Sequence, residues 1–262
     1  MELCDLTWVE AREWLQRDPV VIVPLGSTEQ HGPHLPLKVD IAAADYIARK
    51  VAEKTNMLVT PPLNFGFSEL WHTYPGTISF SAETFRRAVH DICYSLIRCG
   101  FKKFFLLNGH NPNLHLMQSV ANDLVDRYEK EGIAVAAATY IFMAPEECNQ
   151  IGENFRDGTH ANEMETSIML ALDQEHVKMD LAQEVSKRYR PRRVIAFEQS
   201  AMILNRWPDS NLYDGTYGNP GLATVEKGRA YLEVLIEKIS RFVIEFNNGQ
   251  FNPSQNNGSP KE

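Results

Sequence analysis

The sequence predicts an α/β protein made of a single domain with a mostly parallel central sheet, and three observations support this. The 262 residues are 44% hydrophobic and 23% charged, which is typical of a globular protein with a large core. Short apolar runs, such as Val20 to Leu25 and Phe104 to Leu107, are typical of strands buried on both faces of a parallel sheet. Amphipathic segments of helical length separate these runs, and this alternation indicates βαβ units in one doubly wound sheet.

Capping residues and glycines mark the ends of several expected helices. Thr7 and Glu10 form a capping box ahead of a short helix. Ser81 can cap a longer helix, and Gly100 and Gly132 stand where glycine commonly ends one. In chain order, the pattern predicts helices at 8–15, 42–54, 82–99, 113–131 and 162–172, and strands at 20–25, 57–61, 104–107 and 133–140.

The last third of the chain has a weaker pattern until its final helix. Residues 174–222 lack a clean period and are expected to form loops over one edge of the sheet. A long helix is expected at 224–246, because its apolar residues share one face. The remaining residues have the composition of a disordered terminus. We therefore expect one domain over residues 1–246 and a disordered tail over 247–262.

Charge and composition exclude several classes of protein. The 26 Lys and Arg residues against 34 Asp and Glu give a formal charge of −8, which disfavours binding to nucleic acid. No apolar run approaches the ~20 residues of a membrane helix, and the N-terminus has no signal-peptide core. We therefore expect a cytoplasmic protein with no membrane partner. The four cysteines form no CxxC pair and no zinc-ribbon spacing.

Histidines and carboxylates cluster just after three of the expected strands. In open α/β sheets, ligands bind beyond the carboxyl ends of the strands, so these positions point to a common site. The segments are Gly26 to His34 with Asp40 following, Asn108 to Asn113, and Asp157 to Ser167. If only one of these motifs were present, its residues would be interpreted as a buried core histidine or a helix cap. Their coincidence at equivalent positions indicates a metal site instead.

The residue types narrow the chemistry of that site. Imidazole and carboxylate without thiolate are ligands for zinc, manganese or iron. Glu29 and His31 are two residues apart, so an extended segment points both to the same side, and Asp40 lies near a helix start. The segment GSTEQ is not a G-x-S-x-G nucleophile elbow, and no P-loop, dinucleotide-binding G-x-G-x-x-G or H-E-x-x-H motif is present. Cys148 has no adjacent base and is interpreted as an ordinary loop thiol.

Four ordered motifs carry a resemblance to the creatininase (creatinine amidohydrolase) family. They are PLGSTEQHGPHLPLKVD, HTYPGTIS, NGHNPN and HANEMETS. The resemblance covers residues 20 to 172 and, more loosely, the last helix. It implies a three-layer α/β/α fold, a metal-dependent hydrolase with a small-molecule substrate, and a homo-oligomer, often a hexamer.

Carried over to this sequence, the resemblance implies a centre with two divalent metals, zinc first and manganese or iron as alternatives. Glu29 and His110 would bind one metal, His31 the other, and Asp40 would bridge them. Creatininase has a further glutamate ligand in the NGH segment, where this chain has Pro112. Members of the family instead carry a glutamate three residues after the histidine of the last motif, so the resemblance assigns Glu163 as the fifth ligand and as a catalytic residue. Glu165 is interpreted as structural or as supporting a ligand.

The remaining roles concern proton transfer and the pocket walls. His160 matches a histidine that shuttles protons in the family. Trp71, His72 and Tyr74 are expected to bind substrate, with a packed aromatic turn as the alternative, and no cofactor other than the metals is expected. His34 is expected to orient a metal ligand. The histidines on expected helices or their ends are interpreted as structural or surface residues: His90, His115 and His176.

The activity that the resemblance implies is hydrolysis by a metal-bridging hydroxide that attacks a carbonyl. The first expectation for the substrate is a small lactam, amide or formamide with a non-peptide C–N bond. A close alternative is cleavage of a C–C bond in a cyclic ketone, such as an oxidised inositol. A non-catalytic metal-binding scaffold is the alternative from another class, and the presence of His160 disfavours it.

Overall fold

The core of the protein is a parallel four-stranded sheet with the strand order β2-β1-β3-β4. A computed structural model describes residues 1–153, 160–189 and 214–250. Strand β1 (Val20–Leu25) pairs with β2 (Leu58–Val59) on one side and with β3 (Lys103–Asn108) on the other. β3 pairs in turn with β4 (Ala134–Thr139). β1, the first strand in the chain, is therefore an inner strand, and later strands are added on both of its sides. This is the doubly wound arrangement that the sequence predicts.

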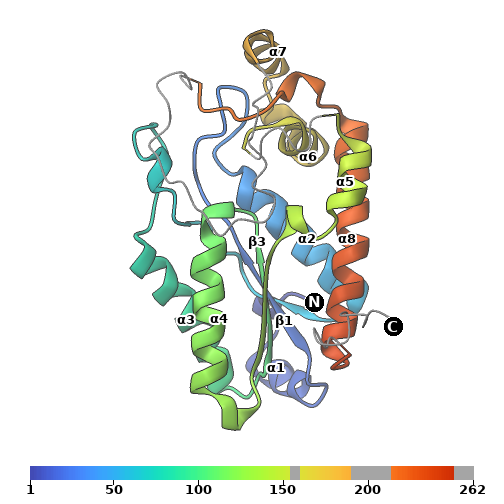
Figure 1. Cartoon of the computed structure of the whole chain (residues 1–262). Coiled ribbons are helices and arrows are strands. Elements are labelled where there is room, and N and C mark those ends of the chain that lie inside the picture. Colours follow the sequence, from blue (N-terminus) through green and yellow to red (C-terminus); the bar gives the residue numbers. More distant parts are fainter. Residues whose placement is uncertain (154–159, 190–213, 251–262) are drawn as a thin grey trace, which may run out of the picture.

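Helices cover both faces of this sheet and make three layers (Figure 1). The layer that contains α1 (Trp8–Leu15), α3 (Ala82–Arg98) and α4 (Leu114–Arg127) packs on one face. The opposite face is covered by α2 (Val39–Thr55) and α8 (Val225–Asn247), with α5 (Pro145–Ile151) beside α8 and α6 (Glu163–Asp173) packed against α8 and α2. The predicted three-layer α/β/α fold is confirmed.

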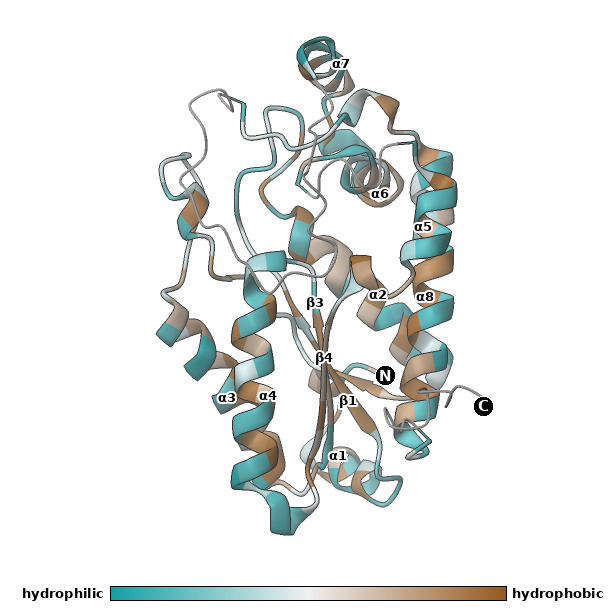
Figure 2. Ribbon diagram, in the orientation of Figure 1, coloured by the Kyte–Doolittle hydropathy of each residue, from teal (hydrophilic) through white to brown (hydrophobic). Residues whose placement is uncertain are grey.

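The alternation of residues along the strands explains how one sheet serves two cores. Val20 and Ile22 of β1 belong to the core under α2 and α8, whereas Val21 and Val23 belong to the core under α3 and α4. Successive side chains of a strand point to opposite faces, so a run of six apolar residues supplies both. Figure 2 shows the strands in apolar colours between helices that carry polar residues as well.

Most predicted helices begin and end near their expected positions. The capping box of α1 is present, because the Thr7 hydroxyl accepts the Glu10 backbone N–H and the Glu10 carboxylate accepts the Thr7 backbone N–H. Ser81 and Thr224 cap α3 and α8 in the same way. The short 3-10 helices are Leu3–Asp5, Glu69–Trp71, Asn111–Asn113, Glu129–Glu131, Tyr140–Phe142, Gln174–His176 and Pro220–Leu222.

The structure corrects two expectations about the chain after residue 140. Residues 174–222 are not only loops, because α7 (Met179–Arg188) lies within them and buries Ala182 and Val185. The helix α5 was not predicted either. The expected tail lies mostly outside the described residues, and α8 runs to Asn247. None of the helices described is both long enough and apolar enough to cross a membrane.

Glycines after two strands allow α2 to begin directly against the carboxyl edge of the sheet. A Cβ on Gly109, just after β3, would lie 2.0 Å from the carbonyl oxygen of Asp40. A Cβ on Gly26, just after β1, would lie 2.6 Å from the Cα of Ile41. Only glycine fits such close backbone approaches. The start of α2, and Asp40 with it, is therefore held between the ends of β1 and β3.

Candidate metal centre

Four of the sequence-predicted ligands meet at the carboxyl edge of the sheet. Glu29 and His31 lie in the loop after β1, Asp40 in the first turn of α2, and His110 directly after β3. The Asp40 carboxylate lies between the two histidines: its Oδ1 is 3.0 Å from His31 Nε2, and its Oδ2 is 2.8 Å from His110 Nδ1. All four side chains are buried. The structure thus brings together residues up to 81 positions apart, counted from 29 to 110.

The donor atoms form two groups that share Asp40. Glu29, Asp40 and His110 make the first, with one donor atom from each within 4.8 Å of the others. His31, Asp40 and Glu165 make the second under the same limit. We call these five residues, Glu29, His31, Asp40, His110 and Glu165, the ligand cluster. Within this cluster, Asp40 is the carboxylate that both donor groups share.

The fifth member of the ligand cluster is Glu165, not Glu163 as expected from the sequence. Glu163 Oε1 accepts from Lys227 Nζ at 2.6 Å, and Glu163 Oε2 accepts from the backbone N–H of Glu153. Glu165 Oε2 lies 4.0 Å from His31 Nε2. Residues two apart on a helix point about 200° apart around its axis, so only one of the two glutamates can face the cluster. Glu163 therefore belongs to neither donor group of the described residues, and its expected role as a metal ligand stays a prediction.

The first turn of α6 holds Glu165 in place. Asn162 is the N-cap, and its side-chain oxygen accepts the backbone N–H of Glu165 at 3.0 Å. The backbone N–H of Ala161 donates to Glu165 Oε2 at 2.5 Å. Ala161 adopts a positive φ of 52°, a conformation that costs energy for a residue with a Cβ. This strained turn aims the backbone N–H at the carboxylate.

Backbone carbonyls orient both histidines for metal binding. His31 Nδ1 lies 3.2 Å from the carbonyl oxygen of Glu29, and His110 Nε2 lies 2.9 Å from that of Phe67. A carbonyl can only accept, so each of these nitrogens carries the ring proton. The other nitrogen of each ring faces Asp40, and its lone pair becomes available when an ion displaces the proton there. This is the tautomer that a metal ligand requires, fixed by the hydrogen bond at the far nitrogen.

Side chains around the cluster form hydrogen bonds that hold Asp40 and His110 in position. Ser27 Oγ donates to Asp40 Oδ2 at 2.7 Å. Asn108 at the end of β3 accepts the backbone N–H of His110 through Oδ1 and donates to its carbonyl through Nδ2. Asn113 Nδ2 donates to the same Asn108 oxygen at 3.1 Å. These contacts leave little freedom in the two loops that carry ligands.

The carboxylate of Glu29 shows that the donor set fits divalent cations. Both of its oxygens are buried, and neither receives a hydrogen bond from the residues that the structure describes. The nearest nitrogens to Oε1 are His110 Nδ1 at 3.4 Å and His160 Nδ1 at 3.6 Å. A buried carboxylate without hydrogen bonds is costly unless a cation compensates its charge. Two imidazoles and three carboxylates are a typical donor set for zinc or manganese.

The protonation of the cluster reflects its excess of negative charge. Burial opposes the charged form of His31, but the adjacent Asp40 outweighs this and raises its pKa to about 9. The pKa of His110 is raised well above its ordinary value, since Glu29 and Asp40 outweigh the effect of burial. Burial raises the pKa of Glu165 to about 7. Protons on the histidines thus take the place that cations can occupy.

An aromatic wall borders the ligand cluster on the side of His160. The His160 ring lies 4.2 Å from that of His31 and is stacked on Trp71, with centroids 4.5 Å apart and an interplanar angle of 16°. Tyr74 and Tyr217 pack edge-on against Trp71. The pKa of His160 is lowered well below its ordinary value by burial and by the neighbouring His31. The proton-shuttle residue of the resemblance therefore lies beside the cluster.

The two other residues of the expected substrate wall differ in their positions. Trp71 is buried and Tyr74 is partly buried next to it. His72 is exposed, and its Nδ1 lies 2.6 Å from the carbonyl oxygen of Glu69. Trp71 thus stacks on the His160 ring with Tyr74 packed against it, and the expectation that His72 binds substrate stays a prediction.

Several residues of the site were missed or given another role by the sequence analysis. Gln30, Ser27 and Tyr217 were not singled out, although Gln30 stands between two ligands in the first motif. His34 Nε2 bonds to Thr166 Oγ1 at 3.0 Å, so it supports the start of α6 beside Glu165 rather than a histidine ligand. Asp157, Gly158 and Thr159 of the last motif lie outside the described residues.

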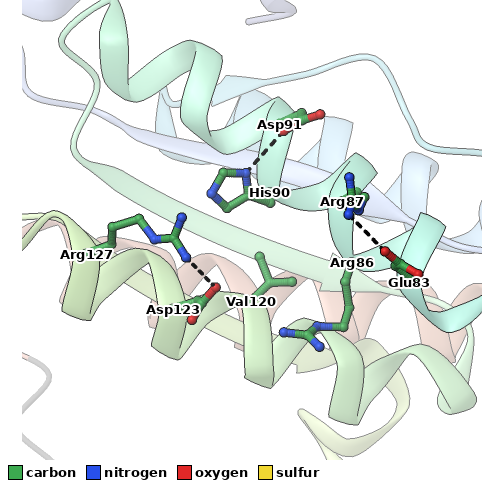
Figure 3. A pocket seen from close by; sticks show the side chains of 8 residues that line it. All are labelled: Glu83, Arg86, Arg87, His90, Asp91, Val120, Asp123 and Arg127. Atoms are coloured by element: carbon green, nitrogen blue, oxygen red, sulfur yellow. Dashed lines mark hydrogen bonds and ion pairs between the residues drawn. The ribbon is translucent and has the colours of Figure 1, made fainter.

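A second group of charged residues lies far from the cluster, in a surface pocket between α3 and α4 (Figure 3). His90 pairs with Asp91, Glu83 with Arg87, and Asp123 with Arg127. These ion pairs are between neighbours on the same helix, and they satisfy most of the charges within the pocket. His90 is partly buried and contacts Asp91 on its own helix, apart from the ligand cluster.

Comparison with known proteins identifies relatives over nearly the whole chain. The model of the creatininase family, described as creatinine amidohydrolase, matches residues 4–243. A creatinine amidohydrolase of Pseudomonas putida is 28% identical, with 92% of this chain and 95% of that protein covered. A 3-dehydro-scyllo-inosose hydrolase of Thermotoga maritima is also 28% identical, over 95% and 86%. A mycofactocin precursor peptide peptidase of Mycobacterium ulcerans is 31% identical, over 62% of each chain.

Solved structures agree with the fold. A crystal structure of creatinine amidohydrolase superimposes with a TM-score of 0.79 at 26% identity, covering 96% of this chain and 98% of the other. A mutant creatininase of Zn-Zn type and a manganese form of creatininase each give a TM-score of 0.77 at 26% identity, over 93% and 97%. Structures of this kind thus include both zinc and manganese forms.

Proposed function

Because the chain belongs to the creatininase family, we propose that this hydrolase uses two divalent metals to cleave a non-peptide C–N bond in a small lactam, amide or formamide. The observation that carries the proposal is the ligand cluster itself, with a buried Glu29 carboxylate that receives no hydrogen bond from the described residues and a shared Asp40. Glu29, Asp40 and His110 would hold one ion. His31, Asp40 and Glu165 would hold the other.

Pro112 supports a substrate or a geometry different from that of creatininase. The resemblance places a glutamate ligand of creatininase at this position, and proline offers no side-chain donor. Glu165 approaches the second group from α6, on another side of the site. We propose that this exchange keeps the number of ligands and changes the direction from which one of them reaches the ion.

The residues of the chain would divide the catalytic work. When bound, two divalent ions would polarise a substrate carbonyl and lower the pKa of water to about 7. Asp40, held by Ser27, would fix the spacing of the two positions. His160 would hold a proton next to the departing group, and Trp71 would shield it from bulk water by stacking on its ring.

The relatives supply a second candidate substrate. The Thermotoga maritima relative is a hydrolase of an inosose and covers 95% of this chain, so cleavage of a C–C bond in a cyclic ketone remains the second proposal. The zinc- or manganese-loaded protein should be tested against creatinine, N-formyl amines, an inosose and a short peptide. Turnover of the lactam or formamide alone supports the first proposal. Turnover of the inosose or the peptide alone overturns it.

The variant His160→Asn tests whether the site is catalytic at all. A catalyst should lose turnover by about 100-fold or more and keep its metals, because general acid–base groups contribute about 10²–10⁴-fold. A metal-binding scaffold would show no turnover in the wild type or in His160→Asn.

We expect two divalent metals per chain in protein purified without chelator. The two donor groups share only Asp40, so each has two further ligands of its own. Elemental analysis after reconstitution with zinc or manganese should approach two ions per chain. A reproducible value of one or less would show that the two groups do not act as separate positions.

Metal binding should release protons at pH 7. His31 has a pKa of about 9 and His110 a raised pKa, so without metal both carry a proton that an incoming ion must displace. Affinity should therefore fall as the pH is lowered from 9. Calorimetry of Zn²⁺ binding in two buffers of different ionisation enthalpy should report about two to three protons released per chain, because Glu165, with a pKa of about 7, adds to the two histidines. The exposed His176→Ala should leave this number unchanged, and release of no protons would contradict the assignment.

A homo-oligomer, a cytoplasmic location and the absence of a nucleic-acid partner remain predictions from the sequence and the resemblance.

A further inference from the structure

The side chain of Gln30 links three segments of the site. Gln30 stands between two members of the ligand cluster and is itself buried. Its Oε1 accepts the backbone N–H of Gly32 at 2.9 Å, and its Nε2 donates to the carbonyl of Gly215 at 3.1 Å. The same Nε2 lies 2.9 Å from His160 Nε2. The position of Gly215 depends on the lack of a side chain, since a Cβ there would lie 2.0 Å from Gln30 Oε1.

These contacts determine which way the Gln30 amide is turned. A rotated amide would set its NH₂ group against the N–H of Gly32 and its oxygen against the carbonyl of Gly215. Both hydrogen bonds would then become repulsive contacts. The observed orientation is therefore the one that the backbone enforces, with the NH₂ group toward Gly215 and His160.

The orientation of the amide in turn determines the tautomer of His160. An amide NH₂ group can only donate, so His160 Nε2 must accept and carries no proton. The proton of the neutral ring is then on Nδ1. This atom faces Glu29, with its Oε1 at 3.6 Å. His31 and His110 have the opposite arrangement toward the cluster, because carbonyls accept the protons of their far nitrogens and the nitrogens that face Asp40 are the ones an ion would bind.

The difference matters because His160 also lies within reach of a metal. Donor atoms of Glu29, His31 and His160 lie within 4.8 Å of one another, which is the spacing of a third candidate ligand group. With a lone pair toward the cluster, His160 could bind an ion. With an N–H there, it cannot, and it can instead donate a hydrogen bond to a substrate atom.

We propose that Gln30 is a positioning residue that keeps the His160 proton on Nδ1, so that His160 faces the ligand cluster as a hydrogen-bond donor and not as a metal ligand. The proposal rests on the proposed function, because it assigns a role to His160 beside bound metals. Gln30 itself touches no reacting atom. It acts through the ring nitrogen that faces away from Glu29.

The variant Gln30→Glu reverses the polarity of the contact at nearly constant shape. A carboxylate can accept but not donate, so it favours a proton on His160 Nε2 and a lone pair on Nδ1. The matched control is Thr77→Val, since Thr77 Oγ1 accepts the backbone N–H of Gln30 and does not contact its amide. A change in the loop structure alone would alter His160 in both variants, whereas loss of the amide NH₂ group would alter it only in Gln30→Glu.

The test is ¹⁵N NMR of the full-length, zinc-loaded protein with labelled histidine, with His160 assigned by its loss in His160→Asn. We expect Nδ1 of His160 to be protonated in the wild type and in Thr77→Val, and Nε2 in Gln30→Glu. The cobalt-substituted Gln30→Glu should also show a changed visible spectrum, because His160 becomes available as a ligand. A proton on Nε2 in the wild type, or an unchanged tautomer in Gln30→Glu, would overturn the proposal.

Turnover provides a second readout once a substrate from the panel is found. Loss of a residue that orients a functional group costs about 10–100-fold, so kcat of Gln30→Glu should fall by that factor with KM little changed. Thr77→Val should stay within about twofold. The NMR result requires no substrate, so absence of hydrolysis would count against the proposed function and leave the inference about the His160 tautomer intact. A wrong tautomer would overturn that inference and leave the proposed function intact.

Discussion

Asp40→Ala is expected to lose both metal ions and all hydrolytic activity. Asp40 is the member of the ligand cluster that belongs to both donor groups, with one oxygen toward His31 and the other toward His110. Burial tends to raise its pKa, but the two histidines outweigh this and hold the pKa well below the ordinary range, so the carboxylate is ionised. Without it, each group retains one carboxylate and one histidine, which is too few donors to hold an ion tightly.

Asp45→Ala is the matched control, because Asp45 lies on the same helix and pairs with Arg49 at 2.8 Å away from the cluster. It should keep both ions. Asp40→Ala should also lower the free energy of unfolding, since removing one partner of a buried ion pair costs about 3–5 kcal/mol. Elemental analysis measures the metal content of the two variants, and denaturant unfolding measures their free energies of unfolding. Full metal content in Asp40→Ala would show that Asp40 is not the bridge.

The meeting of four ligands could be predicted because it depends on topology more than on side-chain detail. Residues that directly follow parallel strands must lie at the same edge of the sheet. Glu29 and His110 lie in the loops after β1 and β3, which are neighbouring strands whose last residues, Leu25 and Asn108, pair with each other. Asp40 needed one further fact, the start of α2 at Val39, and the sequence analysis placed that start three residues too late.

The choice between Glu163 and Glu165 depends on information that sequence spacing does not contain. Both glutamates lie in the first turn of α6, and their order along the chain says nothing of which side of that helix faces the sheet. Asn162 carried a usable signal, since an N-cap side chain accepts the backbone N–H three residues later and so fixes how the first turn is oriented. The partner of Glu163 is Lys227, on α8, and no local pattern brings it there.

The helices that were not predicted are those with little apolar surface. α7 is ten residues long, mostly polar, and buries Ala182 and Val185, so few apolar residues distinguish this segment from a loop. The seven residues of α5 begin with Pro145, which fits the first position of a helix as well as it fits a turn. Packing against α8, and not intrinsic propensity, decides the structure of α5.

Glu165→Gln and Glu163→Gln form the sharpest test of the ligand cluster, because they make the same chemical change in the same helical turn. A neutral amide oxygen binds a dication more weakly than a carboxylate does. Glu165→Gln should therefore release the ion held with His31 and Asp40 and keep the one held by Glu29, Asp40 and His110. Its metal content should fall from two per chain toward one, with turnover lost.

Glu163→Gln should keep both ions and instead lose stability. The Glu163 carboxylate is buried against Lys227, whose side chain is 21% exposed. Breaking a fully buried pair costs about 3–5 kcal/mol, and the partial exposure of the lysine reduces this to about 1–3 kcal/mol. The amide can still accept the backbone N–H of Glu153, which limits the loss further. Denaturant unfolding of the metal-loaded protein measures the difference.

The variant Lys227→Met separates the ion pair from the ligand cluster. Alone it should destabilise the protein, because it leaves the Glu163 carboxylate buried without its cation. Combined with Glu163→Gln it should recover part of that loss, since the double variant no longer buries a charge at position 163 and loses the exposed contact of Lys227 with Glu153. The metal content should be two per chain in every combination. If Glu163→Gln strips an ion while Glu165→Gln retains both, the side of α6 that faces the metals is the reverse of the one described, and Lys227 then competes with a metal for its carboxylate.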